Sequence, residues 1–232
     1  MGRDTPLDAI LTLPAAWPFA GSLAPRVLER LAHHAASGRI AHSAETGTGK
    51  STLLLSHLSA QHVVFALDDR GHGDSLDSVR GSPLLRGETV EFVVGPSQAT
   101  LPAHRFARPL DVALIDGAHA FPFPHLDYYF LYPHLAAGAL LVVDDVHLRA
   151  VNDLFRFLRT DSMFTLLEVE RTTAFFRRTD APLFDPFGDG WWLQPYSRRV
   201  WPPLAGLPLR EALKALIPWR LRETLRRPWG GA

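Results

Sequence analysis

Apolar runs bounded by acidic residues recur along the middle of the chain, and segments with a helical pattern separate them. The runs HVVFALDD, DVALIDG and ALLVVDD occupy residues 62–69, 111–117 and 139–145, and TVEFVVG occupies residues 89–95. Short, mostly apolar runs of this kind are typical of strands buried in a parallel sheet whose crossovers are helices. The sequence therefore predicts an α/β fold with a Rossmann-like, doubly wound sheet.

The segments around these runs have the patterns of helices and of a hairpin. We expect helices over residues 22–36, 51–58, 126–138 with Gly138 at the end, and 151–158. Apolar residues recur there every three or four positions. A rather polar strand over residues 39–44 precedes the second of these helices, and residues 164–179 are expected to form a hairpin that closes the sheet.

Composition limits the classes of protein to which the chain can belong. Its 232 residues suffice for one sizeable domain, and 47% apolar with 21% charged residues is ordinary for a globular protein. A net charge of zero gives no reason to expect a nucleic-acid partner. The absence of cysteine excludes disulfides, thiolate metal sites and a cysteine nucleophile. No apolar run reaches the ~20 residues of a membrane span, so we expect a cytoplasmic protein.

The chain changes character twice, which suggests three regions. Residues 1–21 are expected to be an N-terminal arm, residues 22–180 the main domain, and residues 181–232 an extension rich in proline, tryptophan and arginine. The extension has the composition of a lid, of a contact surface or of an addition to the core, and the sequence leaves these open.

Acidic residues stand where the predicted strands end. They are Glu45, Asp68, Asp69, Asp116, Asp144 and Asp145. In open α/β sheets, ligands bind in the crevice outside the carboxyl ends of the strands. Acids at four such ends together favour a binding site over a set of unrelated polar caps. We expect the functional site at this edge of the sheet.

The stretch AETGTGKST, residues 44–52, allows two interpretations. As a phosphate-binding P-loop it would place Lys50 on a nucleotide phosphate, with Asp144 holding magnesium, although alanine replaces the first glycine of that motif. Alternatively, Gly47 and Gly49 form a turn that lets the backbone approach a ligand closely. An acid about 20 residues further on then meets a ribose hydroxyl. Asp68 and Asp69 have that spacing, and a P-loop enzyme has no need of them.

Five motifs occur in order along the chain: ETGTGKST, FALDD, VVGPSQATLP, LIDGAHAF and GALLVVDDVH. In this order and spacing the chain resembles class I S-adenosylmethionine-dependent methyltransferases, in the branch of the catechol and macrocin O-methyltransferases. The resemblance covers about residues 22–178. It implies a seven-stranded, mostly parallel sheet with an antiparallel last strand, and S-adenosylmethionine as cofactor. The chain departs from relatives in its polar first strand and in Lys50, where many relatives have a small residue.

The resemblance also implies roles for individual residues. The residues expected to bind the cofactor are Glu45, Gly47, Gly49, Asp68, Asp69, Ser97, Gln98 and Asp116. In metal-dependent relatives, acids in the positions of Asp116, Asp144 and Asp145 bind magnesium, and oxygen ligands suit Mg²⁺. His119, three residues after Asp116, is the candidate base that takes a proton from a hydroxyl.

The sequence thus predicts an enzyme that methylates a hydroxyl of a small molecule, with Asp116 and His119 as catalytic residues. Mg²⁺ as a second cofactor and assembly into a homo-oligomer are further expectations. Two alternatives stay open at this point: a P-loop NTPase that uses residues 44–51 and Asp144, and a binding protein that retains the fold without catalysis.

Overall fold

A computed structural model of the chain describes residues 6–18, 22–36, 38–68 and 75–197. The chain divides into two compact units, Met1–Asp189 and Gly190–Ala232. In the second unit the described residues form two short 3₁₀ turns, Trp191–Leu193 and Pro195–Ser197. No helix in the described part of the chain is long and apolar enough to cross a membrane.

The first unit is built on a single seven-stranded sheet. The strands are β1 (Ile40–Thr46), β2 (Ser59–Ala66), β3 (Val90–Val94), β4 (Leu110–Ile115), β5 (Leu135–Val143), β6 (Phe164–Glu170) and β7 (Thr173–Arg178). Their order is β3-β2-β1-β4-β5-β7-β6. The pairs among β1 to β5 are parallel, whereas β7 is antiparallel to both β5 and β6. The predicted seven-stranded sheet with an antiparallel last strand is confirmed.

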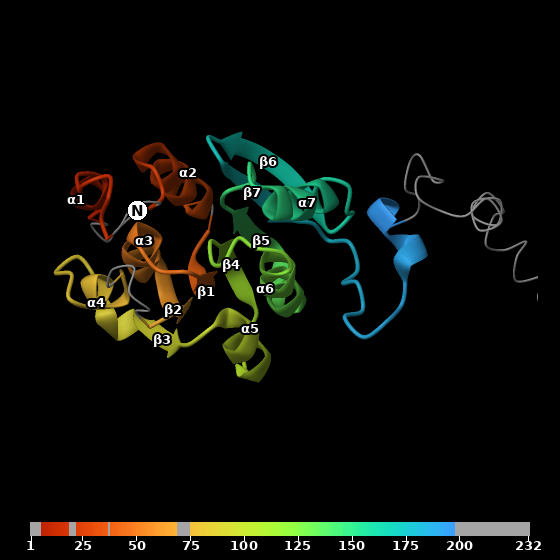
Figure 1. Cartoon of the computed structure of the whole chain (residues 1–232), viewed down its shortest axis with the longest axis horizontal. Coiled ribbons are helices and arrows are strands. Elements are labelled where there is room, and N and C mark those ends of the chain that lie inside the picture. The colour runs from red at the N-terminus through yellow and green to blue at the C-terminus, as the bar shows by residue number, and fades with distance from the viewer. Residues whose placement is uncertain (1–5, 19–21, 37, 69–74, 198–232) are drawn as a thin grey trace, which may run out of the picture. The chain divides into compact units, whose positions relative to one another are not determined.

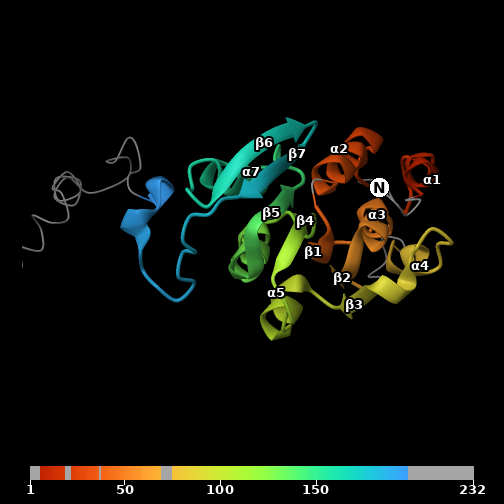
Figure 2. The same cartoon turned by 180° about the vertical axis from the view of Figure 1, so that it is seen from behind.

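Helices cover both faces of the sheet (Figures 1 and 2). They are α1 (Leu7–Leu11), α2 (Pro25–Ala35), α3 (Lys50–Leu58), α4 (Ser75–Arg80), α5 (Ser97–Thr100), α6 (Phe123–Leu131) and α7 (Arg149–Leu158). Side chains of a strand point alternately to its two faces. Val112 and Leu114 of β4 accordingly pack in one core with α1 to α4, while Ala113 and Ile115 pack in a second core with α6 and α7. This two-sided burial is why the central strands appear as unbroken apolar runs in the sequence.

The predicted end of the third helix, residues 126–138, at Gly138 is wrong. Helix α6 ends at Leu131, a 3₁₀ turn follows over Tyr132–His134, and β5 begins at Leu135. Pro133 lies in that turn and has no N–H to continue the helical hydrogen bonds. Gly138, with φ of 81°, instead lies inside β5, where the pairing with β4 is irregular.

Candidate functional site

A cavity of about 480 Å³ lies at the carboxyl ends of the parallel strands. The loops after β1, β2, β3, β4 and β5 all contribute to its wall. The lining residues include Gly47, Thr48, Gly49, Lys50, Ser51, Leu67, Gly95, Ser97, Gln98, Asp116, Gly117, His119 and Asp145. The cavity therefore lies at the edge of the sheet where the sequence predicts the site.

The turn after β1 brings the backbone against the loop after β4. Gly47 has φ of 92°, and a Cβ there would lie 2.2 Å from the carbonyl oxygen of Asp116. Only glycine adopts this conformation without strain and leaves the space that the neighbouring backbone needs. Gly49 has an extended backbone with φ of 174°, and a Cβ there would meet nothing nearer than Pro18 Cδ at 3.8 Å. Contacts within the protein thus require glycine at position 47 and not at position 49.

Glu45 lies beneath this turn and is 1% exposed. Its Oε1 accepts hydrogen bonds from the Thr52 hydroxyl and, at 3.1 Å, from His62 Nε2. Thr52 Oγ1 in turn accepts the Gly49 N–H at 3.0 Å, so Glu45 acts on the turn through Thr52. A hydrogen bond donated to a buried carboxylate is stronger than one between neutral groups. The geometry agrees with the expectation that Glu45 organises the loop.

Buried hydrogen bonds to neighbouring side chains also explain why β1 contains polar residues. On the far side of His62, Nδ1 lies 2.7 Å from Ser43 Oγ, which lies 2.6 Å from Ser59 Oγ. Ser43, Ser59 and His62 are each at most 2% exposed. Buried polar groups are tolerated when they are paired, and here β1 and β2 supply partners for each other.

The P-loop interpretation is incompatible with this geometry. A P-loop needs its residues between the two glycines free to wrap around phosphate, but Ala44, Glu45 and Thr46 belong to β1. The turn between β1 and α3 is consequently only three residues long.

Asp116, His119 and Asp145 converge at the carboxyl ends of β4 and β5. One potential ligand atom from each lies within 4.8 Å of the others. His119 Nε2 is 3.0 Å from Asp145 Oδ2, and His147 Nδ1 is 3.6 Å from Asp145 Oδ1. Asp145 adopts the left-handed conformation with φ of 55°, an uncommon one outside glycine that recurs at functional sites.

The pKa of the Asp116 carboxyl is raised well above its ordinary value. Burial is the largest cause, and the neighbouring carboxylates of Asp144, Glu45 and Asp145 add to it. Crowded carboxylates favour a bound proton or a bound cation, because either relieves their mutual repulsion. This crowding is a local property of the site, since the chain as a whole is neutral.

Asp144 does not join this group. It is 6% exposed, and its Oδ1 accepts a hydrogen bond from the Thr173 hydroxyl at 2.5 Å. Burial raises the pKa of the Asp144 carboxyl, and the bond from Thr173 opposes the rise. Of the three predicted metal ligands, the structure therefore brings together Asp116 and Asp145, with His119 rather than Asp144 as the third.

Of the remaining predicted residues that the structure describes, Asp68 is not among those that line the cavity. Asp68 follows β2 and is exposed. Asp69 lies outside the described residues. Ser97 and Gln98 both line the cavity from the loop after β3, where the adenine was expected.

Asp127 of α6 is a buried acid that the sequence did not indicate. Its carboxyl is 0% exposed, and burial raises its pKa. A Cβ on Gly117 would lie 3.0 Å from Asp127 Oδ2 and 3.1 Å from Thr46 Oγ1, so Asp127 lies directly under the cavity wall. The available signal was helical spacing, since Asp127 shares the buried face of α6 with Pro124, Tyr128 and Leu131.

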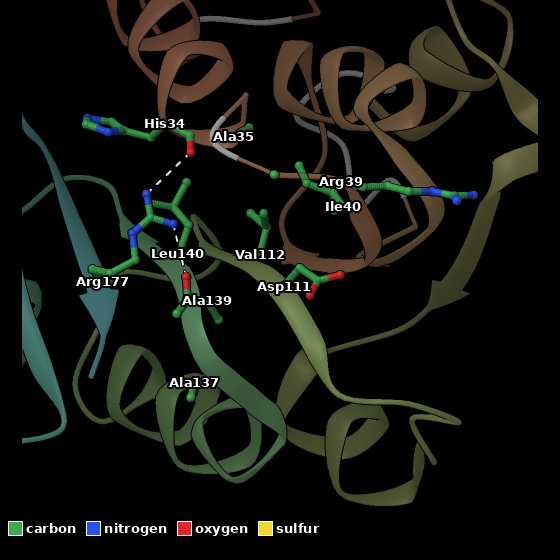
Figure 3. Close-up of a pocket in the computed structure, with 12 residues that line it drawn as sticks. His34, Ala35, Arg39, Ile40, Asp111, Val112, Ala137, Ala139, Leu140 and Arg177 are labelled. Atoms are coloured by element: carbon green, nitrogen blue, oxygen red, sulfur yellow. Dashed lines mark hydrogen bonds between the residues drawn. The ribbon is translucent and has the colours of Figure 1, made fainter. Parts of the chain in front are cut away.

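A second cavity, of about 160 Å³, lies at the opposite edge of the sheet, where β1, β4 and β5 begin (Figure 3). Arg177 spans it, donating to the carbonyl oxygens of Gly138 at 3.0 Å and His34 at 3.4 Å. Asp111 Oδ2 accepts the backbone N–H groups of Ala41 and His42. These groups satisfy backbone atoms at the strand ends, and we assign the cavity no function.

A family model described as a methyltransferase domain matches residues 44–146. This range runs from the last three residues of β1 to the residues just after β5, and it contains the loops after β1 to β5 that line the cavity. Over residues 44–146 the chain is similar to a methyltransferase domain. A search of curated proteins found no match.

Three solved structures illustrate the fold that this chain shares with known proteins. The O-methyltransferase TomG from Streptomyces achromogenes, in complex with SAM, is 18% identical, with a TM-score of 0.55 over 77% of this chain and 91% of that one. An O-methyltransferase from Bacillus cereus in complex with SAH is 16% identical, with a TM-score of 0.55 over 77% and 93%. Cofactor-bound Rv0187 from MTB is 19% identical, with a TM-score of 0.56 over 74% and 85%. At these identities the likeness shows a shared fold.

Proposed function

We propose that this protein transfers the methyl group of S-adenosylmethionine to a hydroxyl oxygen of a small molecule. The single observation that carries the proposal is the cavity at the carboxyl ends of β1 to β5, with the Gly47 turn on one side and the Asp116–His119–Asp145 group on the other. The family match and the O-methyltransferases of the same fold support it.

In this proposal the residues of the cavity divide into those that hold the cofactor and those that act on the acceptor. The turn over residues 47–49 holds the methionine part, Asp68 holds the ribose hydroxyls, and Ser97 with Gln98 meets the adenine. When bound, S-adenosylmethionine supplies an electrophilic methyl group on a positively charged sulfur. The protein contributes mainly by positioning, which can supply about 7–11 kcal/mol of the barrier in well-oriented reactions.

His119 is proposed to take the proton of the attacking hydroxyl. Its Nε2 lies 3.0 Å from Asp145 Oδ2, so a proton on Nε2 is held by that carboxylate. In this tautomer Nδ1 is unprotonated and can accept a proton from the substrate. Asp145 then stabilises the imidazolium that forms.

The donor atoms of Asp116, Asp145 and His119 also fit a divalent cation, because they lie within 4.8 Å of one another. A bound Mg²⁺ would lower the pKa of a substrate hydroxyl and orient it. We expect activity to fall by about tenfold or more in EDTA if the cation takes part, given the several kcal/mol that such charge stabilisation provides. Full activity in EDTA, with restored Mg²⁺ adding nothing, would leave His119 as the proton acceptor without a metal.

The cofactor assignment is tested by isothermal titration calorimetry with S-adenosylhomocysteine and, separately, with ATP plus Mg²⁺. We expect micromolar binding of S-adenosylhomocysteine and no heat from the nucleotide. Binding of the nucleotide alone would overturn the proposal.

Replacing Asp68 by alanine is expected to weaken S-adenosylhomocysteine binding by about tenfold, because one or two charge-assisted hydrogen bonds to the ribose are lost. Calorimetry measures the change. Glu91→Ala is the matched control, since Glu91 is an exposed carboxylate on β3. An equal loss in both variants would point to general electrostatics and would remove Asp68 from the binding site.

Replacing His119 by asparagine is expected to lower kcat by about 10²- to 10⁴-fold, the usual contribution of a general base. Binding of S-adenosylhomocysteine should be nearly unchanged. His147→Asn serves as the control, because His147 also faces Asp145, at 3.6 Å, but is 55% exposed. If both variants lose activity equally, the proton acceptor is not His119.

A further inference from the structure

The described residues that line the methyltransferase cavity carry an uneven set of charges. Asp116 and Asp145 contribute carboxylates, and Lys50 is the one lysine or arginine among these lining residues. Burial lowers the pKa of the Lys50 ammonium, which a bound anion would oppose. The two acids lie after β4 and β5, whereas Lys50 begins α3 on the side of the β1 turn. The cavity is thus acidic at one side and basic at the other.

Lys50 is buried to an unusual degree for a lysine. It is 1% exposed, and lysine is almost never fully buried without a partner. Within the described part of the chain its ammonium donates to one acceptor, the carbonyl oxygen of Leu13 at 3.2 Å, and no carboxylate forms an ion pair with it. An ammonium has three N–H donors, so it has capacity for a further, anionic acceptor.

The start of α3 adds a second attraction for an anion at the same place. The helix has nine residues and no acidic residue in its first turn. Its first N–H groups and the positive end of the helix dipole lie at the turn over residues 47–49, which also lines the cavity. Ser51, in the same helical turn as Lys50, is a further lining residue with a hydroxyl donor.

We propose that Lys50 binds the carboxylate of the methionine part of S-adenosylmethionine and makes the site selective for ligands that have this carboxylate. The inference rests on the proposed function. The cofactor has a single carboxylate, which Asp116 and Asp145 repel and Lys50 attracts. This arrangement fixes the direction in which the cofactor lies, with its methionine end at the start of α3. The bound carboxylate also provides a counterion for the buried ammonium, which has none among the residues that the structure describes.

Two ligands that differ in the amino-acid part test the proposal. S-adenosylhomocysteine contains the carboxylate, whereas 5′-methylthioadenosine retains the adenosine and the thioether sulfur without it. In Lys50→Met, which keeps the length of the side chain and removes its charge, we expect calorimetry to show S-adenosylhomocysteine binding weakened by about 10- to 100-fold. Binding of 5′-methylthioadenosine should change by less than about twofold, because it makes no contact with the ammonium.

Arg39→Met is the matched control. It removes one positive charge from an exposed residue just before β1, at the opposite end of that strand, and should alter neither affinity. If Lys50→Met does not fold, Lys50→Gln provides the same comparison. The unaltered protein gives a further check, since decarboxylated S-adenosylhomocysteine should bind about 10- to 100-fold more weakly than its parent.

The outcomes separate the inference from the function on which it rests. If the Lys50 variants bind both ligands equally more weakly, Lys50 contributes only through its hydrogen bond to Leu13. This result would overturn the inference while the cofactor assignment stands. Equal affinity of the unaltered protein for the parent and decarboxylated ligands would overturn it in the same way. No binding of S-adenosylhomocysteine by the unaltered protein would overturn the proposed function, and the inference with it.

Discussion

Replacing Gly47 by alanine is expected to abolish detectable binding of S-adenosylhomocysteine and to lower the free energy of unfolding by about 2–4 kcal/mol. The new Cβ would lie 2.2 Å from the carbonyl oxygen of Asp116, and a backbone atom cannot rotate away as a side chain does. The φ of 92° adds strain for any residue other than glycine. Relief requires the β1 turn to move away from the β4 loop, and this movement displaces both walls of the cavity. Urea denaturation and calorimetry measure the two effects.

Gly49→Ala is the matched control, two residues further along the same turn. Its backbone is extended, and the new methyl group would meet only Pro18 Cδ, at 3.8 Å. We expect its free energy of unfolding to change by less than about 1 kcal/mol. If Gly49→Ala destabilises the protein as much as Gly47→Ala, the close approach to Asp116 is not what requires glycine in the turn.

Replacing Asp116 by asparagine is expected to lower methyl transfer by about 100-fold or more while raising stability at neutral pH. The activity falls because an amide cannot carry the negative charge that a proton or cation at this position needs. The stability rises because a buried carboxylate among Asp144, Glu45 and Asp145 is costly to ionise. A gain of about 1–2 kcal/mol corresponds to the removal of one such charge.

The Asp116 carboxyl should also make the free energy of unfolding depend on pH in a definite direction. The pKa of Asp116 is raised in the folded protein, so the folded state binds more protons than the unfolded state above the ordinary pKa of aspartate. Stability therefore falls as pH rises from that ordinary value through the folded pKa, and it is lower at neutral pH than at acidic pH as far as Asp116 is concerned. Asp116→Asn should lose this slope. Thermal or urea denaturation across the range measures it, and an unchanged slope would show that Asp116 is not the residue responsible.

The sequence was sufficient for the fold because its central strands are buried on both faces. Residues 112–115 and 139–143 are apolar throughout for that reason, and the acids that follow them mark the carboxyl edge of the sheet. The end of α6 was missed because Gly138 is a conventional helix terminator, whereas Pro133 had already ended the helix. Local signals of this kind compete, and only the three-dimensional path decides between them.

The sequence predicted where the site lies in the fold, but it did not predict every contact between the side chains of the site. Strand ends brought Asp116 and Asp145 together as expected, because that depends on topology alone. The orientation of Asp144 toward Thr173 depends on β7, which begins 29 residues further along the chain and leaves no trace near Asp144 in the sequence. Asp127 was missed because one acid on an amphipathic helix resembles a solvated residue until the neighbouring loop covers it.

The chain of buried side chains from Ser59 through Ser43 and His62 to Glu45 and Thr52 has a consequence for how such a protein can change over evolution. Any single apolar replacement within it leaves a neighbour buried without its partner, at a cost of about 1–3 kcal/mol. Replacing all five together by well-packed apolar residues can be nearly neutral. The five positions should therefore change together during evolution, because the effect of each substitution on stability depends on the residues at the other four.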